Sequence, residues 1–91
     1  MAVCIRLRGE GWTAEQVDEL NKLIDPDANP PEGLLFHGAY FVDGGIEVTD
    51  FWVSREAFDR FAAERIGPAA GQLGLHPGEV HEYRVHETFP R

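Results

Sequence analysis

Two ionisable residues in neighbouring segments of one predicted hairpin have the types and the spacing for acid–base chemistry. His37 lies within an otherwise apolar run, Leu34–Val42, and Asp50 lies within the next such run, Ile46–Val53. A carboxylate beside an imidazole orients the ring and favours its charged form, so that the histidine can act as a general base near neutral pH. The alternative is a buried polar pair that satisfies its own hydrogen bonds or fixes a dimer interface. We predict that His37 and Asp50 are the catalytic residues.

The length of the turn between the two strands decides whether this pair meets. Asp43-Gly44-Gly45 favours a tight hairpin turn, because glycine adopts the positive φ angles that such turns need. A four-residue loop over residues 42–45 places His37 directly opposite Asp50. A two-residue loop at the two glycines pairs His37 with Trp52 and still leaves Asp50 on the same face. A three-residue loop places His37 and Asp50 on opposite faces, which would separate them.

The residue types that usually bind metals or cofactors lack the required spacing. No two histidines form the H-x-H or H-x-x-x-H arrangement of a metal site; they are His37, His76, His81 and His86. No glycine-rich phosphate-binding loop follows a strand. The single cysteine, Cys4, is interpreted as a small buried residue rather than a nucleophile. We therefore predict neither a metal nor a cofactor.

The first part of the chain predicts a strand and a helix. Residues 2–8 alternate between apolar and polar side chains, which is typical of a strand. Thr13 and Gln16 form a capping box, which marks the start of a helix. That helix ends before Pro26, because the residue preceding a proline is pushed out of the helical conformation. Its apolar stripe consists of Val17, Leu20, Leu23 and Ile24.

The part of the chain after the hairpin predicts a second helix and a last strand. Ser54 can cap a helix that buries Phe58, Gly67-Pro68 interrupts it, and Gly74 ends the turn that follows. Residues 79–87 form the last strand. The order βαββαβ predicts an α+β fold, a ferredoxin-like sandwich with a four-stranded antiparallel sheet. With 91 residues and no linker or repeat, we expect a single domain over residues 1–91.

Both faces of the hairpin are largely apolar, although the helices of a ferredoxin-like fold cover only one. Leu35, Ala39 and Phe41 share a side with His37, and the other side carries Leu34, Phe36 and Tyr40. Of all residues, 43% are hydrophobic, more than one core of this size needs. We therefore predict a homodimer in which two sheets face each other as an α+β barrel. Its interior would hold His37 and Asp50 and accept a small hydrophobic ligand.

The charge and the termini exclude several classes of partner. The formal net charge of −8 argues against nucleic acid and anionic membrane surfaces, which attract clustered basic residues. No apolar run approaches the ~20 residues of a membrane span. The start, MAVCIRLRG, is too short and too charged for a signal peptide, and one cysteine forms no internal disulfide. We expect a cytoplasmic protein without nucleic-acid or membrane partners.

The segment Trp52-Val53-Ser54-Arg55-Glu56-Ala57-Phe58 resembles a motif of the antibiotic biosynthesis monooxygenase-like family. In that motif, a strand ending in tryptophan is followed by x-Ser-x-Glu-Ala-aromatic at the start of a helix. The family belongs to the dimeric α+β barrel superfamily, and the resemblance covers nearly the whole chain in element order. The chain is most similar to a small, uncharacterised bacterial subset with a Gly-Leu-x-x-His strand, here Gly33-Leu34-Leu35-Phe36-His37.

The resemblance implies a cofactor-independent enzyme of the monooxygenase or cyclase type, acting on a hydrophobic aromatic or polyketide-like small molecule. In the oxygenases of the family, the tryptophan at this strand end lines the pocket, which implies the same for Trp52. We predict that Tyr40 and Phe58 contact the substrate as well. Heme-degrading members of the superfamily bind iron through a histidine of the second helix, and none occurs here between Ser54 and Leu75. The alternative is a non-catalytic ligand-binding or stress-associated dimer whose interior is filled by side chains.

Overall fold

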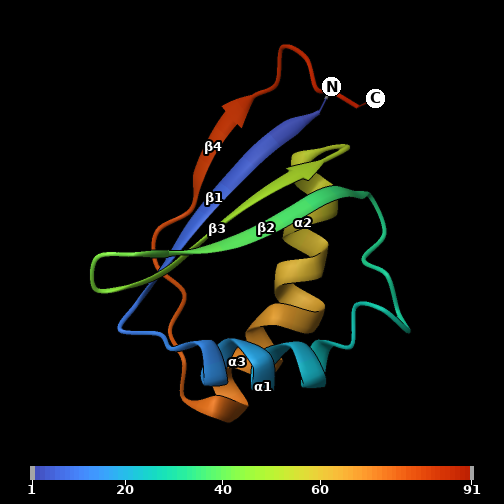
Figure 1. Cartoon of the computed structure of the whole chain (residues 1–91). Coiled ribbons are helices and arrows are strands. Elements are labelled where there is room, and N and C mark those ends of the chain that lie inside the picture. The colour runs from blue at the N-terminus through green and yellow to red at the C-terminus, as the bar shows by residue number, and fades with distance from the viewer. Residues whose placement is uncertain (1, 91) are drawn as a thin grey trace.

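Four antiparallel strands form one sheet, and two helical segments cover one of its faces (Figure 1). The structure is a computed structural model and describes residues 2–90. Its strands are hydrogen-bonded in the order β2-β3-β1-β4. The predicted α+β, ferredoxin-like βαββαβ fold is confirmed. The elements are β1 (Val3–Glu10), α1 (Ala14–Ile24), β2 (Leu34–Val42), β3 (Gly45–Trp52), α2 (Arg55–Phe61), η1 (Ala62–Ile66), α3 (Gly67–Leu73) and β4 (His81–Arg84).

The turn of the β2–β3 hairpin sets the register on which the candidate site depends. Phe41 pairs with Ile46, and His37 pairs with Asp50, as the four-residue loop predicts. Gly44 in this turn has a φ of 84°, a conformation that glycine adopts at little cost. The tight turn therefore brings the histidine and the aspartate together on one face of the sheet.

A bulge near the start of β2 changes the face on which its first residues lie. Leu34 pairs with Trp52, and Phe36 pairs with Phe51, which is adjacent to Trp52 in β3. Two steps along β2 therefore match one step along β3, so β2 contains one extra residue. Leu34 therefore lies on the same face as His37, and the prediction that it shares a face with Phe36 is wrong. The extra residue, Leu35, is displaced and 55% exposed.

The largest buried side chains lie between the helices and the two central strands, β1 and β3. Ile5, Trp52 and Phe58 are each no more than 2% exposed. The Phe58 ring meets the Trp52 ring edge-on, with ring centres 5.8 Å apart. Ser54 caps α2 through its side chain, as predicted. Because aromatic side chains bury large apolar areas, this cluster fixes α2 against the end of β3.

Helix α1 begins at the predicted capping box of Thr13 and Gln16. Leu20 lies on its buried side and is 8% exposed. Leu23 is 43% exposed, so its predicted place in the apolar stripe is wrong. The reason is geometric, because Leu23 follows Val17 by six residues and lies about two-thirds of a turn further round the helix.

Helical structure continues from Arg55 to Leu73, so the predicted break at Gly67-Pro68 is wrong, but a new helix, α3, does begin there with Pro68 in its first turn, as predicted. Gly67 keeps a helical conformation, with φ −56° and ψ −53°. A proline lacks the N–H group and clashes with the carbonyl four residues earlier. The π-helical stretch η1 widens the helix just before Pro68 and accommodates it. Gly74, with a φ of 70°, ends the segment as predicted. None of the helices described over residues 2–90 has the length and apolar character needed to cross a membrane.

Strand β4 is shorter than the predicted 79–87. It covers His81–Arg84 and pairs with the first half of β1, Val3–Arg6, at the edge of the sheet. The face of the sheet that points away from the helices is uncovered in the chain. We refer to it as the open face; its exposed large side chains are Phe36, Tyr40, Val53 and Tyr83.

Candidate active site

His37 and Asp50 form a hydrogen-bonded pair across β2 and β3. The Nδ1 atom of His37 lies 2.5 Å from Oδ1 of Asp50, as expected for residues that face each other in the register. This contact leaves Nε2 of the imidazole for a ligand. The His37 side chain is 43% exposed, whereas that of Asp50 is 7% exposed. The predicted meeting of the two residues is confirmed.

Trp52 holds the second oxygen of the same carboxylate. Its indole Nε1 donates a hydrogen bond of 3.3 Å to Oδ2 of Asp50. Trp52 itself is fully buried. A buried carboxylate is stable only where its oxygens have partners, and here both oxygens have one. The three side chains are therefore linked by two successive hydrogen bonds, in which Trp52 orients Asp50 and Asp50 orients His37.

This arrangement changes the acid–base behaviour of His37. The hydrogen bond from His37 to Asp50 raises the pKa of the imidazole above its ordinary value of 6.5, against the opposite effect of burial. The negative charge of Asp50 acts in the same direction as the hydrogen bond. His37 is thus a stronger base than a free histidine, and Asp50 stabilises the imidazolium that forms when His37 takes a proton.

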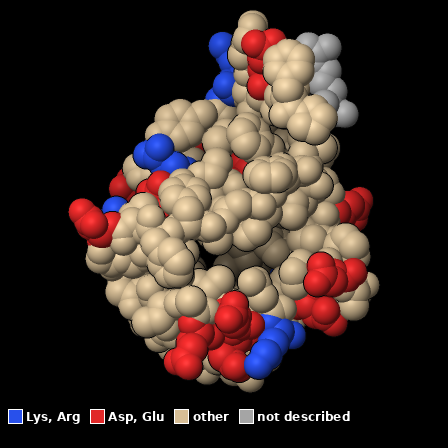
Figure 2. Space-filling model, in the orientation of Figure 1, with Lys and Arg blue, Asp and Glu red and all other residues tan. Residues whose placement is uncertain are grey.

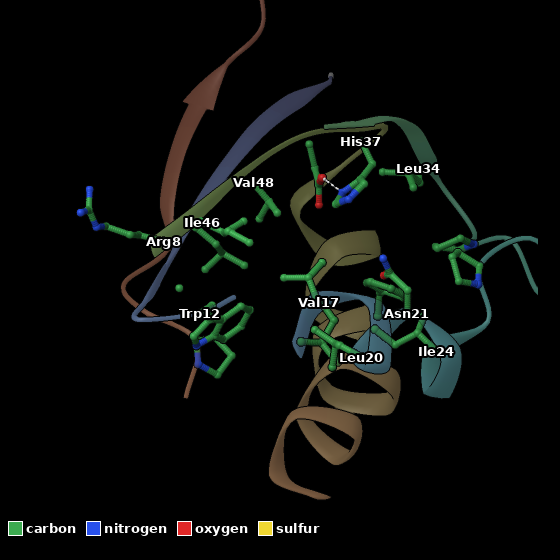
Figure 3. A pocket seen from close by; sticks show the side chains of 18 of the residues that line it. Arg8, Trp12, Val17, Leu20, Asn21, Ile24, Leu34, His37, Ile46 and Val48 are labelled. Atoms are coloured by element: carbon green, nitrogen blue, oxygen red, sulfur yellow. Dashed lines mark hydrogen bonds and ion pairs between the residues drawn. The ribbon is translucent and has the colours of Figure 1, made fainter. Parts of the chain in front are cut away.

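A cavity lies between the sheet and α1, with His37, Asp50 and Trp52 in its wall. It encloses about 890 Å³ of empty space, counting the part that is open to solvent, and Figure 2 shows it as a central hollow. Figure 3 shows side chains from β2, β3 and α1 pointing into it. Its walls are mostly apolar and include Leu7, Val17, Leu20, Ile24, Leu34 and Ile46.

The position of this cavity corrects one prediction. We expected His37 and Asp50 inside a barrel between two sheets. They lie instead on the helix-covered face of a single sheet, the face that also carries Ile5 and Trp52. The alternation of side chains along the strands forces this placement, because residues paired in register point to the same side.

The chain is similar to solved structures but not to curated sequences. No family model and no curated protein sequence matches it. SnoaB, a cofactor-independent oxygenase from Streptomyces nogalater, superposes with a TM-score of 0.66 at 16% identity, covering 99% of this chain and 97% of SnoaB. A candidate antibiotic biosynthesis monooxygenase from Chloroflexus aurantiacus gives 0.67 at 18% identity, covering 97% and 96%. The chain has the fold of the antibiotic biosynthesis monooxygenase-like proteins.

Other solved structures agree with this monooxygenase-like fold. Rv0793 from Mycobacterium tuberculosis superposes with a TM-score of 0.67 at 19% identity, covering 98% of this chain and 99% of Rv0793. The protein NE2512 from Nitrosomonas europaea gives a TM-score of 0.65 at 20% identity, covering 96% and 89%. The resemblance that we inferred from residues 52–58 is thus confirmed at the level of the fold.

Two residues predicted to contact a substrate do not line the cavity of this monooxygenase-like fold. Tyr40 lies on the open face, where its hydroxyl donates to Glu47 and is also 2.7 Å from the Thr49 hydroxyl. It borders a separate, shallower groove near the start of α1. Phe58 is 2% exposed and packs behind Trp52 rather than beside the cavity. Of the three predicted contacts, only Trp52 reaches the cavity wall.

One polar residue of the cavity is absent from the sequence-based predictions. Asn21 lies on α1, one turn after Val17 and one turn before Ile24, and lines the cavity with both. Figure 3 shows its amide on the α1 side of the cavity, across from His37. The feature of the sequence that could have identified Asn21 is its position in the helical repeat, where it interrupts an apolar stripe.

Neither the single cysteine, Cys4, nor a metal site among the described residues adds to the candidate active site. Burial raises the pKa of the Cys4 thiol, which disfavours the thiolate that a nucleophilic cysteine needs. Within the described range, 2–90, no group of three or more His, Cys, Asp or Glu side chains is placed to hold a metal ion. The polar chemistry of the cavity is therefore carried by His37, Asp50 and Asn21.

Proposed function

We propose that this protein is a cofactor-independent enzyme that removes a proton from a hydrophobic aromatic or polyketide-like small molecule. The observation that carries the proposal is the His37–Asp50 pair in the wall of an apolar cavity. His37 is the base, Asp50 supports its charged form, and Trp52 holds Asp50 in place. The cavity wall is mostly apolar with a few polar side chains, as in small-molecule sites, which favours an enzyme over a dimer with a filled interior.

The reaction begins with transfer of a substrate proton to Nε2 of His37. In the monooxygenase form, the resulting carbanion bonds directly to molecular oxygen, and the peroxide anion takes the proton back. Loss of water then leaves one oxygen atom in the product as a carbonyl and releases the other in the water. The likeness to SnoaB, a cofactor-independent oxygenase, supports this form.

A cyclase form shares the first step. The enolate produced by His37 attacks a carbonyl carbon of the same molecule and forms a carbon–carbon bond, after which the new alkoxide takes the proton from the imidazolium. Both forms need a base whose protonated state is stabilised, which Asp50 provides.

Oxygen consumption with a panel of phenols and enolisable polycyclic ketones tests the proposal. We expect at least one compound to be oxidised by the wild-type protein and the rate to fall by about 10²- to 10⁴-fold in His37→Asn. Asparagine keeps a polar group of similar reach but cannot accept the proton. Equal rates in the two proteins would rule out His37 as the base. Mass spectrometry of the products separates oxygen insertion from ring closure.

The open face of the sheet supports a homodimer as part of the same proposal. Phe36 is 63% exposed, and Val53 and Tyr83 are each 47% exposed on it. Monomeric proteins rarely leave several large apolar side chains together in water. A second copy of the chain that packs its own open face on this one would cover them and would leave the cavity, on the opposite face, accessible.

A further inference from the structure

Asn21 places an amide group on the α1 side of an otherwise apolar cavity. Its side chain lies across from His37, which enters from β2 (Figure 3). No residue within 2–90 makes a hydrogen bond to this amide. Asparagine is also a poor residue for a helix interior, so local helix stability does not account for it. The side chain is exposed to solvent, so the free amide is hydrated, and a ligand with a polar atom can replace that water.

Two other polar residues of the cavity wall, Arg8 and Asp50, are already engaged. Arg8 points away from the cavity in Figure 3 and pairs with Glu10. Both oxygens of Asp50 are bonded within the protein. The groups that remain for a ligand are Nε2 of His37, the amide of Asn21 and the indole N–H of Trp12, and of these His37 and Asn21 lie across the cavity from each other (Figure 3). A ligand that uses both has polar atoms at two neighbouring positions and an apolar body.

The electrostatic surroundings of the cavity disfavour an anion. Asp50 carries a negative charge in the wall, and α1 adds Glu15, Asp18 and Glu19. The basic residue of that helix, Lys22, is paired with Glu19 at 3.1 Å. Figure 2 shows acidic side chains gathered below the hollow. With a formal net charge of −8, the chain disfavours an anionic ligand, and the apolar walls disfavour a charge of either sign, so a neutral ligand fits best.

We propose that Asn21 binds the carbonyl oxygen of a neutral, hydrophobic ketone and thereby presents the neighbouring C–H group to His37. The inference rests on the proposed function and names its substrate class. When His37 takes the proton, the C–H bond breaks, its electron pair forms the C=C bond of an enolate, and the carbonyl oxygen gains charge. The N–H of Asn21 donates to that oxygen throughout and more strongly as the charge develops.

Three probes with the same bicyclic skeleton separate the features of this ligand. 2-Tetralone carries an enolisable ketone, tetralin carries no oxygen, and tetrahydro-2-naphthoate carries a carboxylate. Binding of each probe is measured by isothermal titration calorimetry. We expect 2-tetralone to bind about tenfold more tightly than tetralin, as one hydrogen bond predicts, and the carboxylate to bind most weakly.

The variant Asn21→Leu removes the amide at nearly constant volume. We expect it to bind 2-tetralone about tenfold more weakly than the wild type and tetralin at least as well. Asn29→Leu makes the same chemical change in the exposed loop before β2 and is expected to leave all three affinities unchanged. Unchanged 2-tetralone binding in Asn21→Leu would overturn the proposal, and so would an equal loss for tetralin, which would show a packing role. Tighter binding of the carboxylate, or no binding of any probe, would overturn the substrate class.

Exchange of the C–H protons of 2-tetralone in deuterated water, followed by NMR, tests the base separately. We expect faster exchange with the wild type than without protein, and a loss of this acceleration in His37→Asn when 2-tetralone is saturating. Selective binding through Asn21 without any exchange would leave the ligand assignment standing and refute the proposed proton abstraction. The two proposals can therefore fail independently.

Discussion

The Nδ1 atom of His37 and the Oδ1 atom of Asp50 lie 2.5 Å apart, and the two residues are direct partners in the β2–β3 register. The contact is therefore fixed by backbone pairing and does not depend on a flexible loop. Since the carboxylate is almost fully buried and also accepts a hydrogen bond from Trp52, it has little freedom to turn away. A rigid partner of this kind sets both the tautomer and the basicity of an imidazole.

Replacement of Asp50 by asparagine tests this electrostatic role. Asp50→Asn removes the charge and the strong acceptor at nearly constant shape, so we expect the pKa of His37 to fall towards its ordinary value of 6.5 or below it, because burial remains. Titration of the imidazole C–H signals by NMR measures the change, and the other histidines provide internal reference signals. A pKa of His37 that stays the same in Asp50→Asn would contradict the assignment.

The same pair predicts how stability depends on pH. The folded protein raises the pKa of His37 above 6.5, so the folded state binds the proton more tightly than the unfolded chain. The resulting stabilisation is fully present below about pH 6.5 and is lost as the pH rises through the raised value. We expect wild type and His37→Asn to differ more in free energy of unfolding at pH 6 than at pH 9, by a modest amount because His37 is 43% exposed.

Urea unfolding of both proteins at the two pH values measures this difference. The matched control is Asp50→Asn, in which the imidazole has no charged partner and the same comparison should show a smaller pH effect. A difference between wild type and His37→Asn that grows with rising pH would have the wrong sign for a histidine with a raised pKa.

Much of the fold follows from local signals in the sequence. Thr13 with Gln16, and Ser54, cap the two helical segments where the sequence places them. The glycines after Asp43 predicted a hairpin but left three registers open, since each loop length satisfies the same turn chemistry. Pairing of Phe41 with Ile46, which depends on both strands at once, selects among them.

Other features depend on tertiary packing and could not be predicted in the same way. The bulge that moves Leu34 to the face of His37 responds to the fit between β2 and the neighbouring strand, which no local pattern encodes. Asn21 was missed because an exposed polar residue of a helix, which Asn21 is, usually has no role in a site. Only the placement of α1 over the sheet shows that this residue faces a cavity. For the same reason, Tyr40 was assigned to the ligand although it points to the open face.

Trp52 is expected to stabilise the fold through its hydrogen bond as well as through its packing. Trp52→Phe keeps an aromatic ring in the core but leaves Oδ2 of Asp50 without its donor and leaves a partly empty space. We expect a loss of about 1–3 kcal/mol in the free energy of unfolding, measured by urea denaturation. Trp12→Phe makes the same change at a half-buried tryptophan outside the Asp50 contact and should cost less. Equal losses in the two variants would show that the hydrogen bond to Asp50 contributes nothing.

Phe36 provides the sharpest test of the proposed homodimer. Its ring is 63% exposed on the open face, so the folded chain does not need it, whereas a dimer that buries this face does. We expect Phe36→Asp to be a folded monomer by circular dichroism and light scattering, because burying an unpaired carboxylate in an apolar interface is costly. Leu23→Asp places the same charge on α1, at a leucine that is 43% exposed on the helical side, and should leave the dimer intact. If the wild type is itself a monomer at micromolar concentration, the open face has another role. If Leu23→Asp dissociates and Phe36→Asp does not, the dimer uses the helices rather than the sheet, and the cavity beside α1 would then lie at the interface.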